Sequence, residues 1–217
     1  MMTDINNNSP ESLIETFNDK KILIFRKNDI IFSENEPAIG VYFIENGKVK
    51  IVKSGAEYEN KILLFAGKGD FLGLHSVING NKYSNSAIAI EETKTCFIDK
   101  DEFLQKISSD INKKLMVMKL LCSKIDNMEN QISSISDKSA AGRLAESLLF
   151  LLETYGTAKD NFVNISLSVE DFANLTGASK GYLVKIISEF NNNHWIYMED
   201  SKFKILDVEK LKTISGS

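Results

Sequence analysis

This sequence contains few cysteines and histidines, and its basic residues do not outnumber its acidic ones. The 217 residues include two cysteines, Cys96 and Cys122, and two histidines, His75 and His194. Two distant cysteines cannot form a disulfide framework or ligate an iron–sulfur cluster, and they favour a reducing compartment. A metal-dependent barrel enzyme needs several histidines with a carboxylate, and no nucleophile motif or phosphate-binding loop is present. The sequence therefore predicts no enzyme, no catalytic residues, no metal and no cofactor.

Long apolar runs are also absent. The most apolar short run, Leu148 to Leu152, is far below the roughly 20 residues that a membrane span needs. The opening segment "MMTDINNNSPES" is polar and lacks the basic and then apolar order of a signal peptide. We therefore expect a cytoplasmic protein with no membrane partner.

The formal net charge is −4, and acidic residues outnumber basic ones along the whole chain. Residues 1–137 hold 17 Lys/Arg and 20 Asp/Glu, and residues 138–217 hold 9 and 10. Neutralisation of phosphates supplies most of the affinity of nucleic-acid binders. Any binding of DNA by this chain must therefore depend on the local placement of a few lysines.

Residues 20–100 contain short runs with β-strand character, separated by turn residues. The run "KVKIVK" alternates between lysine and an apolar residue from Lys48 to Ile51, which predicts a strand with one face in the core. The sequence "ENG" at 45–47 predicts a hairpin turn between two strands. The number and spacing of the runs predict an antiparallel barrel or jelly roll, with strands at 21–25, 29–32, 41–44, 48–53, 61–65, 86–90 and 95–98.

The apolar period changes after residue 100. No proline or glycine occurs between Lys100 and Ile135, and apolar residues recur there at spacings of four and three, broken once at Glu129. This pattern predicts a long helix that pairs with a copy of itself. The alternative is a helix that packs only along its own barrel. The predicted dimer seam consists of Ile111, Leu115, Met118, Cys122, Ile125 and Ile132.

The last third of the chain has the element order of a winged helix. Residues 138–156 predict an amphipathic helix, and "SVEDFANLTGASKGYLVKIISEF" at 168–190 predicts two short helices. Residues 194–206 then predict a β-hairpin. Within the helix pair, Ser168 and Asp171 suit a capping box, and Gly177 suits a turn with positive φ.

The exposed face of the second short helix is the candidate DNA-binding surface. The N-terminal end of such a helix meets base edges or phosphates. Lysines can contact phosphates or guanine, and a tyrosine hydroxyl can donate to a phosphate. A glycine at this place either allows the helix to approach DNA closely or is simply tolerated near a helix end. The predicted DNA-binding residues are Ser179, Lys180, Gly181, Tyr182 and Lys185.

Over residues 15–212 the chain resembles the family of the cAMP receptor protein and Fnr, the bacterial one-component transcription regulators. The resemblance rests on "IIFSENEPAIGVYFIENGKVKIV", "GKGDFLGLHSVING", "AAGRLAESLLFLL" and the helix pair. It implies an α+β chain with a β-roll sensor at 1–107, a dimerisation helix at 108–137 and a winged helix at 138–217. It also implies a two-fold symmetric site on double-stranded DNA, a small-molecule effector in the roll, and RNA polymerase as a further candidate partner.

The chain departs from this family at the positions that hold a cyclic nucleotide. Family members that bind one carry Gly-Glu and, some ten residues on, Arg-Ser, whereas this chain has Gly73-Leu74 and Tyr83-Ser84. Without the arginine, no bidentate grip on a phosphate is available, and we expect the effector not to be cAMP. The candidate effector residues are these four and His75. We thus expect a homodimeric DNA-binding regulator. The alternative is a module that acts through protein partners and has weakened DNA reading.

Overall fold

The structure of the protein is a computed structural model that describes residues 9–54, 61–80 and 82–216. Within the helix at residues 111–137, the side chains of 127 and 130–137 lie outside the described set. The chain forms two compact units, Met1–Asn127 and Met128–Ser217. The predicted domain boundaries after residues 107 and 137 stay predictions, because the division between the units falls inside a helix.

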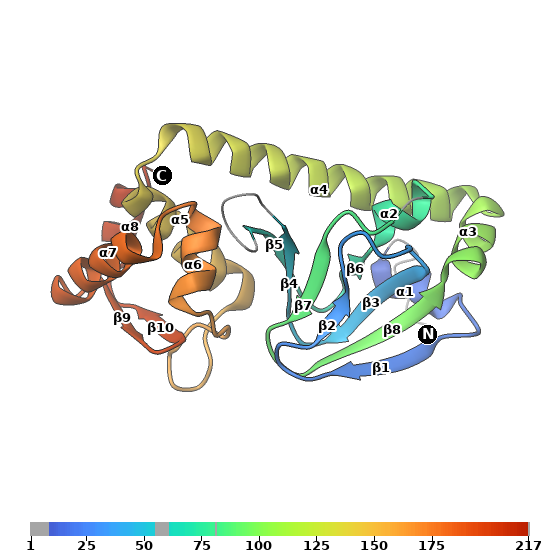
Figure 1. The fold of residues 1–217 in the computed structure, drawn as a ribbon, viewed down its shortest axis with the longest axis horizontal. Helices are drawn as coiled ribbons and strands as arrows, with labels where there is room; N and C mark the ends of the chain where they lie inside the picture. The colour runs from blue at the N-terminus through green and yellow to red at the C-terminus, as the bar shows by residue number, and fades with distance from the viewer. Residues whose placement is uncertain (1–8, 55–60, 81, 217) are drawn as a thin grey trace, which may run out of the picture. The chain divides into compact units, whose positions relative to one another are not determined.

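Unit 1 contains eight strands in two antiparallel sheets together with short helices, within the described residues (Figure 1). One sheet has the order β1-β8-β3-β6 and the other has the order β2-β7-β4-β5. The elements are α1 (Pro10–Glu15), β1 (Lys21–Phe25), β2 (Ile30–Phe32), β3 (Gly40–Asn46), β4 (Val49–Lys53), β5 (Lys61–Ala66), β6 (Phe71–Leu72), α2 (Leu74–Ile78), β7 (Ser86–Ala89), β8 (Thr93–Asp99), α3 (Lys100–Ser108) and the start of α4 (Ile111–Asp137).

The core of unit 1 contains a cluster of aromatic rings among aliphatic side chains. The rings of Phe32 and Tyr83 stack with centroids 4.0 Å apart, and Tyr42 packs on Phe97 at 4.9 Å. In β4 the apolar residues of the alternating run are buried, whereas Lys53 at the strand end is exposed. The predicted jelly-roll class is therefore confirmed. The central strands do not alternate strictly, because β3 is buried at five consecutive residues.

The hairpin predicted at the Asn46–Gly47 turn is wrong. Strand β3 pairs with β8 and β6, whereas β4 pairs with β5 and β7, so the turn carries the chain from one sheet to the other. A Cβ at Gly47 would lie 2.5 Å from the Thr93 hydroxyl oxygen, and its φ is +102°. Glycine is needed here because the chain packs closely where it crosses between the sheets. The Asn46–Gly47 dipeptide is also typical of hairpins, which is why the sequence predicted one.

The long helical region contains a break that the sequence pattern missed. Helix α3 ends at Ser108, and α4 begins at Ile111. The carboxylate of Asp110 accepts a hydrogen bond from the Asn112 backbone N–H at 2.9 Å, which caps the start of α4. A cap of this kind needs neither glycine nor proline, so the absence of both did not guarantee one continuous helix.

Unit 2 contains the remainder of α4, then α5 (Ala140–Tyr155), α6 (Val169–Thr176), α7 (Lys180–Asn192), β9 (Ile196–Glu199), β10 (Lys202–Ile205) and α8 (Val208–Ser215). Helix α5 packs against α8 and α6, and α7 packs against α6 and β9 (Figure 1). Strands β9 and β10 form the expected antiparallel hairpin. In the part of the chain that the structure describes, no helix combines the length and the apolar character that crossing a bilayer requires.

Candidate nucleic-acid interface and effector site

Local capping fixes the geometry of helices α6 and α7. Ser168 and Asp171 form the predicted capping box, with reciprocal bonds of 3.1 and 2.9 Å. Gly177 ends α6 in the left-handed conformation at φ +65°, and the Ser179 hydroxyl accepts from the Tyr182 N–H at the start of α7. These devices are encoded within four residues of the chain, which is why the sequence alone located both helices and the turn.

One side of α7 anchors it to unit 2. Leu183, Ile186, Ile187 and Phe190 are buried. Phe172 of α6 meets Phe203 of β10 edge-on at 5.5 Å, which joins the helix pair to the hairpin. The opposite side of α7 therefore faces away from the core of unit 2.

The predicted DNA-binding residues lie together at the N-terminal end of α7, and all of them are exposed. The Tyr182 side chain is 55% exposed, and a Cβ at Gly181 would meet no heavy atom within 4 Å. The Lys180 ammonium lies 3.7 Å from a carboxylate oxygen of Glu170 on α6. Since both partners of this pair are largely exposed, it is worth little, and a phosphate can compete for the lysine.

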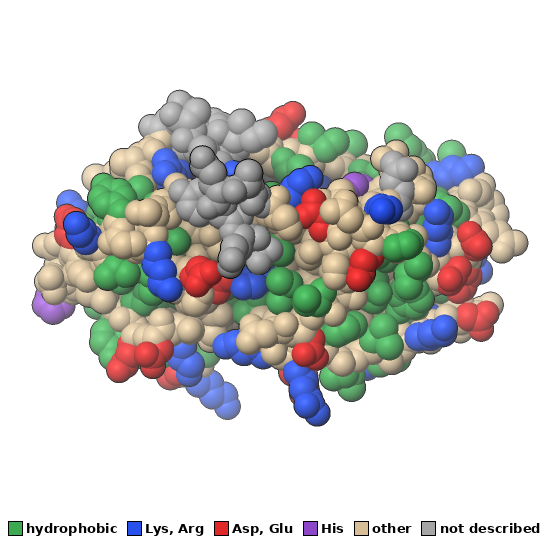
Figure 2. Space-filling model, viewed as in Figure 1, with side chains coloured by type: hydrophobic (Ala, Val, Ile, Leu, Met, Phe, Trp, Pro, Cys, Tyr) green, Lys and Arg blue, Asp and Glu red, His purple; other side chains and the backbone are tan. Residues whose placement is uncertain are grey.

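Two further basic side chains sit on the hairpin, where the sequence analysis did not place binding residues. The ammonium of Lys204 lies 4.2 Å from the centroid of the Phe162 ring, and that of Lys202 lies 5.9 Å away. Phe162 also packs on Tyr197 of β9 at 6.1 Å. The "KFK" run of β10 is the sequence signal for this basic edge. Elsewhere, Figure 2 shows basic and acidic side chains interspersed over the described part of one face.

Arg143 is a structural residue that the sequence analysis also missed. Its Nε donates to the Thr176 carbonyl and its Nη1 donates to the Lys138 carbonyl, both at 2.6 Å. The first acceptor belongs to the last residue of α6, and the second belongs to the segment between α4 and α5. Arg143 therefore ties the chain that follows α4 to the turn before α7. The motif "AAGRLAES" contains Arg143, but no local sequence pattern indicates which carbonyl groups accept its hydrogen bonds.

The five predicted effector residues have different environments in unit 1. Leu74 and Tyr83 are core residues, 1% and 2% exposed. The Tyr83 hydroxyl donates to the Gly40 carbonyl at 2.7 Å, and burial is the main cause that raises its pKa. Gly73 has φ +73°, and a Cβ there would lie 2.7 Å from the Tyr83 ring. Gly73 thus allows the tyrosine to pack closely.

His75 and Ser84 are the two predicted effector residues whose polar atoms meet. The His75 Nε2 and the Ser84 Oγ lie 2.6 Å apart, and Ser76 Oγ lies 3.4 Å from the same nitrogen. Burial lowers the pKa of His75, and the nearby ammonium groups of Lys124 and Lys53 lower it further. The imidazole is therefore held in its neutral form at pH 7.

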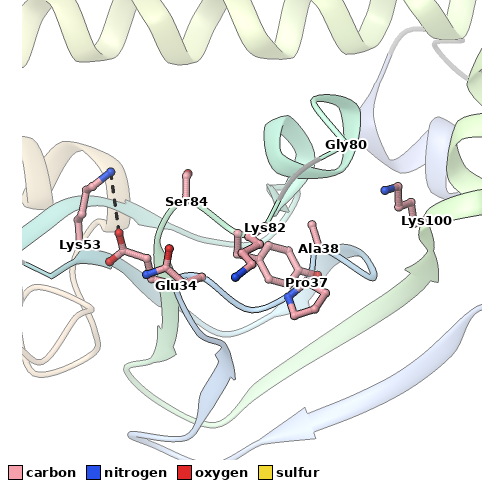
Figure 3. A pocket seen from close by; sticks show the side chains of 10 residues that line it. Glu34, Pro37, Ala38, Lys53, Gly80, Lys82, Ser84 and Lys100 are labelled. Atoms are coloured by element: carbon pink, nitrogen blue, oxygen red, sulfur yellow. Dashed lines mark ion pairs between the residues drawn. The ribbon is translucent and has the colours of Figure 1, made fainter.

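A pocket of about 770 Å³ opens beside Ser84. Figure 3 shows Lys53 and Glu34 at one end of it, with their charged groups 3.9 Å apart, and Lys100 toward the other end. Ser84 and Lys82 also line the pocket. Three lysines and one glutamate give it a positive balance. Among the described residues, no group of three or more His, Cys, Asp or Glu side chains could hold a metal ion.

Comparison with known protein families supports both parts of this arrangement. Residues 22–110 match the cyclic nucleotide-binding domain, and residues 142–214 match the Crp-like helix-turn-helix domain. The chain belongs to the Crp/Fnr family of transcription regulators. As a family member it is a transcription regulator with a DNA-binding helix-turn-helix.

Individual members of the Crp/Fnr family match over most of their length. A CRP-like cAMP-activated global transcriptional regulator from Mycobacterium tuberculosis (strain CDC 1551 / Oshkosh) is 26% identical over 86% of this chain and 84% of the relative. The global nitrogen regulator of Nostoc sp. (strain PCC 7120) is 22% identical over 88% of this chain and 86% of the relative. The structure of FixK2 from Bradyrhizobium japonicum superposes with a TM-score of 0.79 at 19% identity, covering 92% of this chain and 99% of the other.

These comparisons extend the family assignment from motifs to the whole fold of this Crp/Fnr protein. A solved CRP-family regulator from Thermus thermophilus also superposes with a TM-score of 0.79, at 21% identity over 90% of this chain and 97% of the other. At such identities the likeness shows the fold alone.

Proposed function

We propose that this Crp/Fnr protein acts as a homodimer that binds a two-fold symmetric DNA site and responds to an effector other than cAMP. The observation that carries the proposal is the exposed apolar stripe of α4, defined as Ile111, Leu115, Met118, Cys122 and Ile125. Four of these side chains are between 47% and 65% exposed, and Cys122 is exposed as well. Ile132, the last residue of the predicted seam, lies outside the described side chains.

In this proposal the two alternatives for the long helix apply to different faces of α4. Met116 and Val117 are buried against the core of unit 1, and Leu120 and Leu121 pack on it. The stripe occupies other positions, at spacings of four and three, and exposed aliphatic residues in that pattern suit a coiled-coil partner. A second copy of the chain supplies the matching stripe.

A symmetric dimer would present two copies of α7. Helices of this class read half-sites one helical turn apart, about 10 base pairs from centre to centre. Tyr182 and the two lysines of α7 are exposed and available for contacts with bases and phosphates.

Selection of binding sites from a random DNA library by the full chain tests this proposal. We expect enriched sequences with two-fold symmetry at about 100 mM salt, and sedimentation of the free protein as a dimer. Met118→Glu within the stripe should produce monomers and weaken binding, whereas Ser123→Glu, at an exposed position on another side of α4, should not. A monomeric wild-type protein, or a library with no enrichment, would refute the proposal.

The effector part of the proposal rests on the core positions of Leu74 and Tyr83. These two residues stand where the family resemblance puts the Glu and the Arg that hold a cyclic nucleotide, and both side chains are buried and uncharged. No guanidinium is therefore available there for a cyclic phosphate. We expect about 1 mM cAMP to leave the thermal unfolding midpoint unchanged, whereas a clear rise would overturn this part.

The second candidate is a regulatory module that acts through protein partners, and the excess of acidic over basic residues in 138–217, 10 against 9, favours it. Lys180→Ala and Lys185→Ala separate the two functions. If each lysine contacts a phosphate, each variant should reduce the salt slope of DNA binding by about one. Unchanged slopes in both variants would favour the protein-partner module.

A further inference from the structure

Val184 is an exposed apolar residue on the outward side of α7. Its side chain is 46% exposed, whereas the four apolar residues that anchor the helix are buried. A β-branched residue is also a weaker helix former than alanine or leucine. Val184 therefore contributes little to the core of unit 2 or to helix formation, and it lies on the side of α7 that the proposed function places toward DNA.

The neighbours of Val184 on its N-terminal side leave its methyl groups uncovered. Positions three and four residues apart lie side by side on a helix, so Gly181 and Lys180 border Val184 there. A helical side chain leans toward its N-terminal side, where Gly181 has no side chain and a Cβ would meet no heavy atom within 4 Å. The ammonium of Lys180 lies 3.7 Å from a carboxylate oxygen of Glu170 on α6. The first turn of α7 thus offers open space beside an apolar side chain.

The hydroxyl on the C-terminal side of Val184 is already hydrogen-bonded. Ser188 Oγ donates to the Val184 carbonyl at 2.9 Å, so its proton is not available to a base. Gly181, Val184 and Ser188 therefore form a strip of α7 with no free side-chain donor for the acceptors of guanine or adenine. The major groove also presents one apolar group, the 5-methyl group of thymine, and apolar side chains recognise it.

We propose that Val184 determines part of the operator sequence by packing on the 5-methyl group of a thymine in each half-site, and that Gly181 leaves the space for this contact. This inference rests on the proposed function, in which α7 reads the half-site, and it adds a base that the half-site must contain. Lys180 and Lys185 remain the candidates for contacts with phosphate and guanine.

The size of this contact follows from the area of one methyl group. Burial of one methyl group corresponds to about a fourfold change in an equilibrium constant. A two-fold symmetric site contains the contact twice, and the two effects multiply because the half-sites are far apart. Loss of both thymine methyl groups should therefore weaken binding about tenfold to twentyfold. Uracil in place of thymine removes the methyl group and keeps every hydrogen-bonding group of the base.

Uracil substitution in the DNA site selected by the full chain tests the contact. Each symmetric pair of thymines is replaced in turn, and affinity is measured by fluorescence anisotropy at about 100 mM salt. We expect at least one pair to show the loss of about tenfold to twentyfold. At that pair, 5-methylcytosine opposite guanine should bind better than cytosine opposite guanine, because the methyl group is kept. A site in which no thymine pair responds to uracil, or equal affinity for the two cytosine forms, would overturn the proposal.

Val184→Ser should remove the response to uracil at that pair. Serine has a helix propensity similar to that of valine and position 184 is exposed, so the variant should fold normally. Its affinity for the thymine site should fall to about that of the wild type for the uracil site, and uracil should weaken its binding less than about twofold. Val184→Ile keeps the apolar contact and should retain the response. Val208→Ser, at an exposed valine of α8, is the matched control and should change neither the affinity nor the response.

Tyr182 is a second exposed side chain of α7 that can contact a thymine methyl group. If Val184 makes the contact, the response to uracil should persist in Tyr182→Ser. Loss of the response in Tyr182→Ser and its persistence in Val184→Ser would refute this inference alone, because the symmetric site would still be bound. Failure of the wild-type protein to select any site would instead refute the proposed function.

Discussion

Replacement of Gly181 by alanine tests whether α7 approaches DNA closely. A Cβ at this position would meet no heavy atom within 4 Å, and Gly181 is the second residue of α7. Alanine therefore introduces no clash in the free protein and removes the entropic cost of glycine in a helix, about 0.5–1 kcal/mol in a helix interior. Because position 181 is in the first turn of α7, we expect the free energy of unfolding to rise by about 0.5 kcal/mol.

The stability gain has a local reporter. Trp195 is the single tryptophan of the chain, and its ring packs edge-on against Phe190 of α7 with centroids 5.3 Å apart. Its emission therefore follows the unfolding of unit 2, for which about 0.5 kcal/mol corresponds to an increase of about 2–4 °C in Tm. On the DNA side, a methyl group inserted into a close contact costs about 1 kcal/mol or more, and we expect affinity to fall about fivefold or more.

Ser188→Ala is the matched control. Ser188 is exposed on α7 about two turns beyond Gly181, and its hydroxyl donates to the Val184 carbonyl at 2.9 Å. Alanine there also improves helix propensity, so a small gain in stability without loss of DNA affinity is expected. If Gly181→Ala kept full DNA affinity, the glycine would be merely tolerated. A lower Tm of that variant would refute the reasoning about the free helix.

Three further predictions concern the packing of each unit. Gly73→Ala should destabilise unit 1 by about 1–3 kcal/mol more than Gly80→Ala in calorimetry. Both glycines have φ above +70°, but of the two only a Cβ at Gly73 would clash with a buried ring, and equal losses of stability would disprove this steric argument. Arg143→Leu should weaken DNA binding and lower the stability of unit 2 by about 1–3 kcal/mol, measured by unfolding followed through tryptophan fluorescence. Arg143→Lys should restore part of both losses, and unchanged DNA affinity in Arg143→Leu would count against a positioning role of Arg143. The pKa of His75 in the folded protein lies below its ordinary 6.5, so the unfolded chain binds a proton at His75 before the folded chain does, and unit 1 should lose stability as the pH falls below about 6.5. Urea titrations of His75→Asn should lack that part of the pH dependence, and a profile identical to that of the wild type would exclude the role of His75.

Local patterns in the sequence predicted those parts of the fold that depend on neighbouring residues. The caps at Ser168 and Ser179 act within a few positions, and the structure confirms them. The alternation in β4 ends at Ile51, since Ile51 and Val52 are both buried and the register shifts between them. The hairpin at Gly47 failed because the choice of sheet partner is not local. Strand β3 pairs with β8, about 50 residues further on, and Tyr42 and Phe97 face each other across that pairing.

The same distinction explains which site residues escaped prediction. Arg143 and its Thr176 acceptor are 33 positions apart, and Lys124 and its Phe71 acceptor are 53 apart, so no window of sequence contains either contact. Tyr83 was named for its place in a motif, yet its hydroxyl is used inside the core.

The two faces of α4 connect the predicted and the unpredicted parts of the molecule. The predicted seam follows the regular spacing of a coiled coil, whereas the face against the core mixes Val117, Leu121 and a lysine, and has no such pattern. A helix that only paired with its copy would not need an ammonium directed at a backbone carbonyl of the roll. A helix that only covered the roll would not leave Met118 and Ile125 more than half exposed. One helix therefore combines a face that packs on the core of unit 1 with an exposed apolar stripe, and the proposed dimer uses the second of these faces.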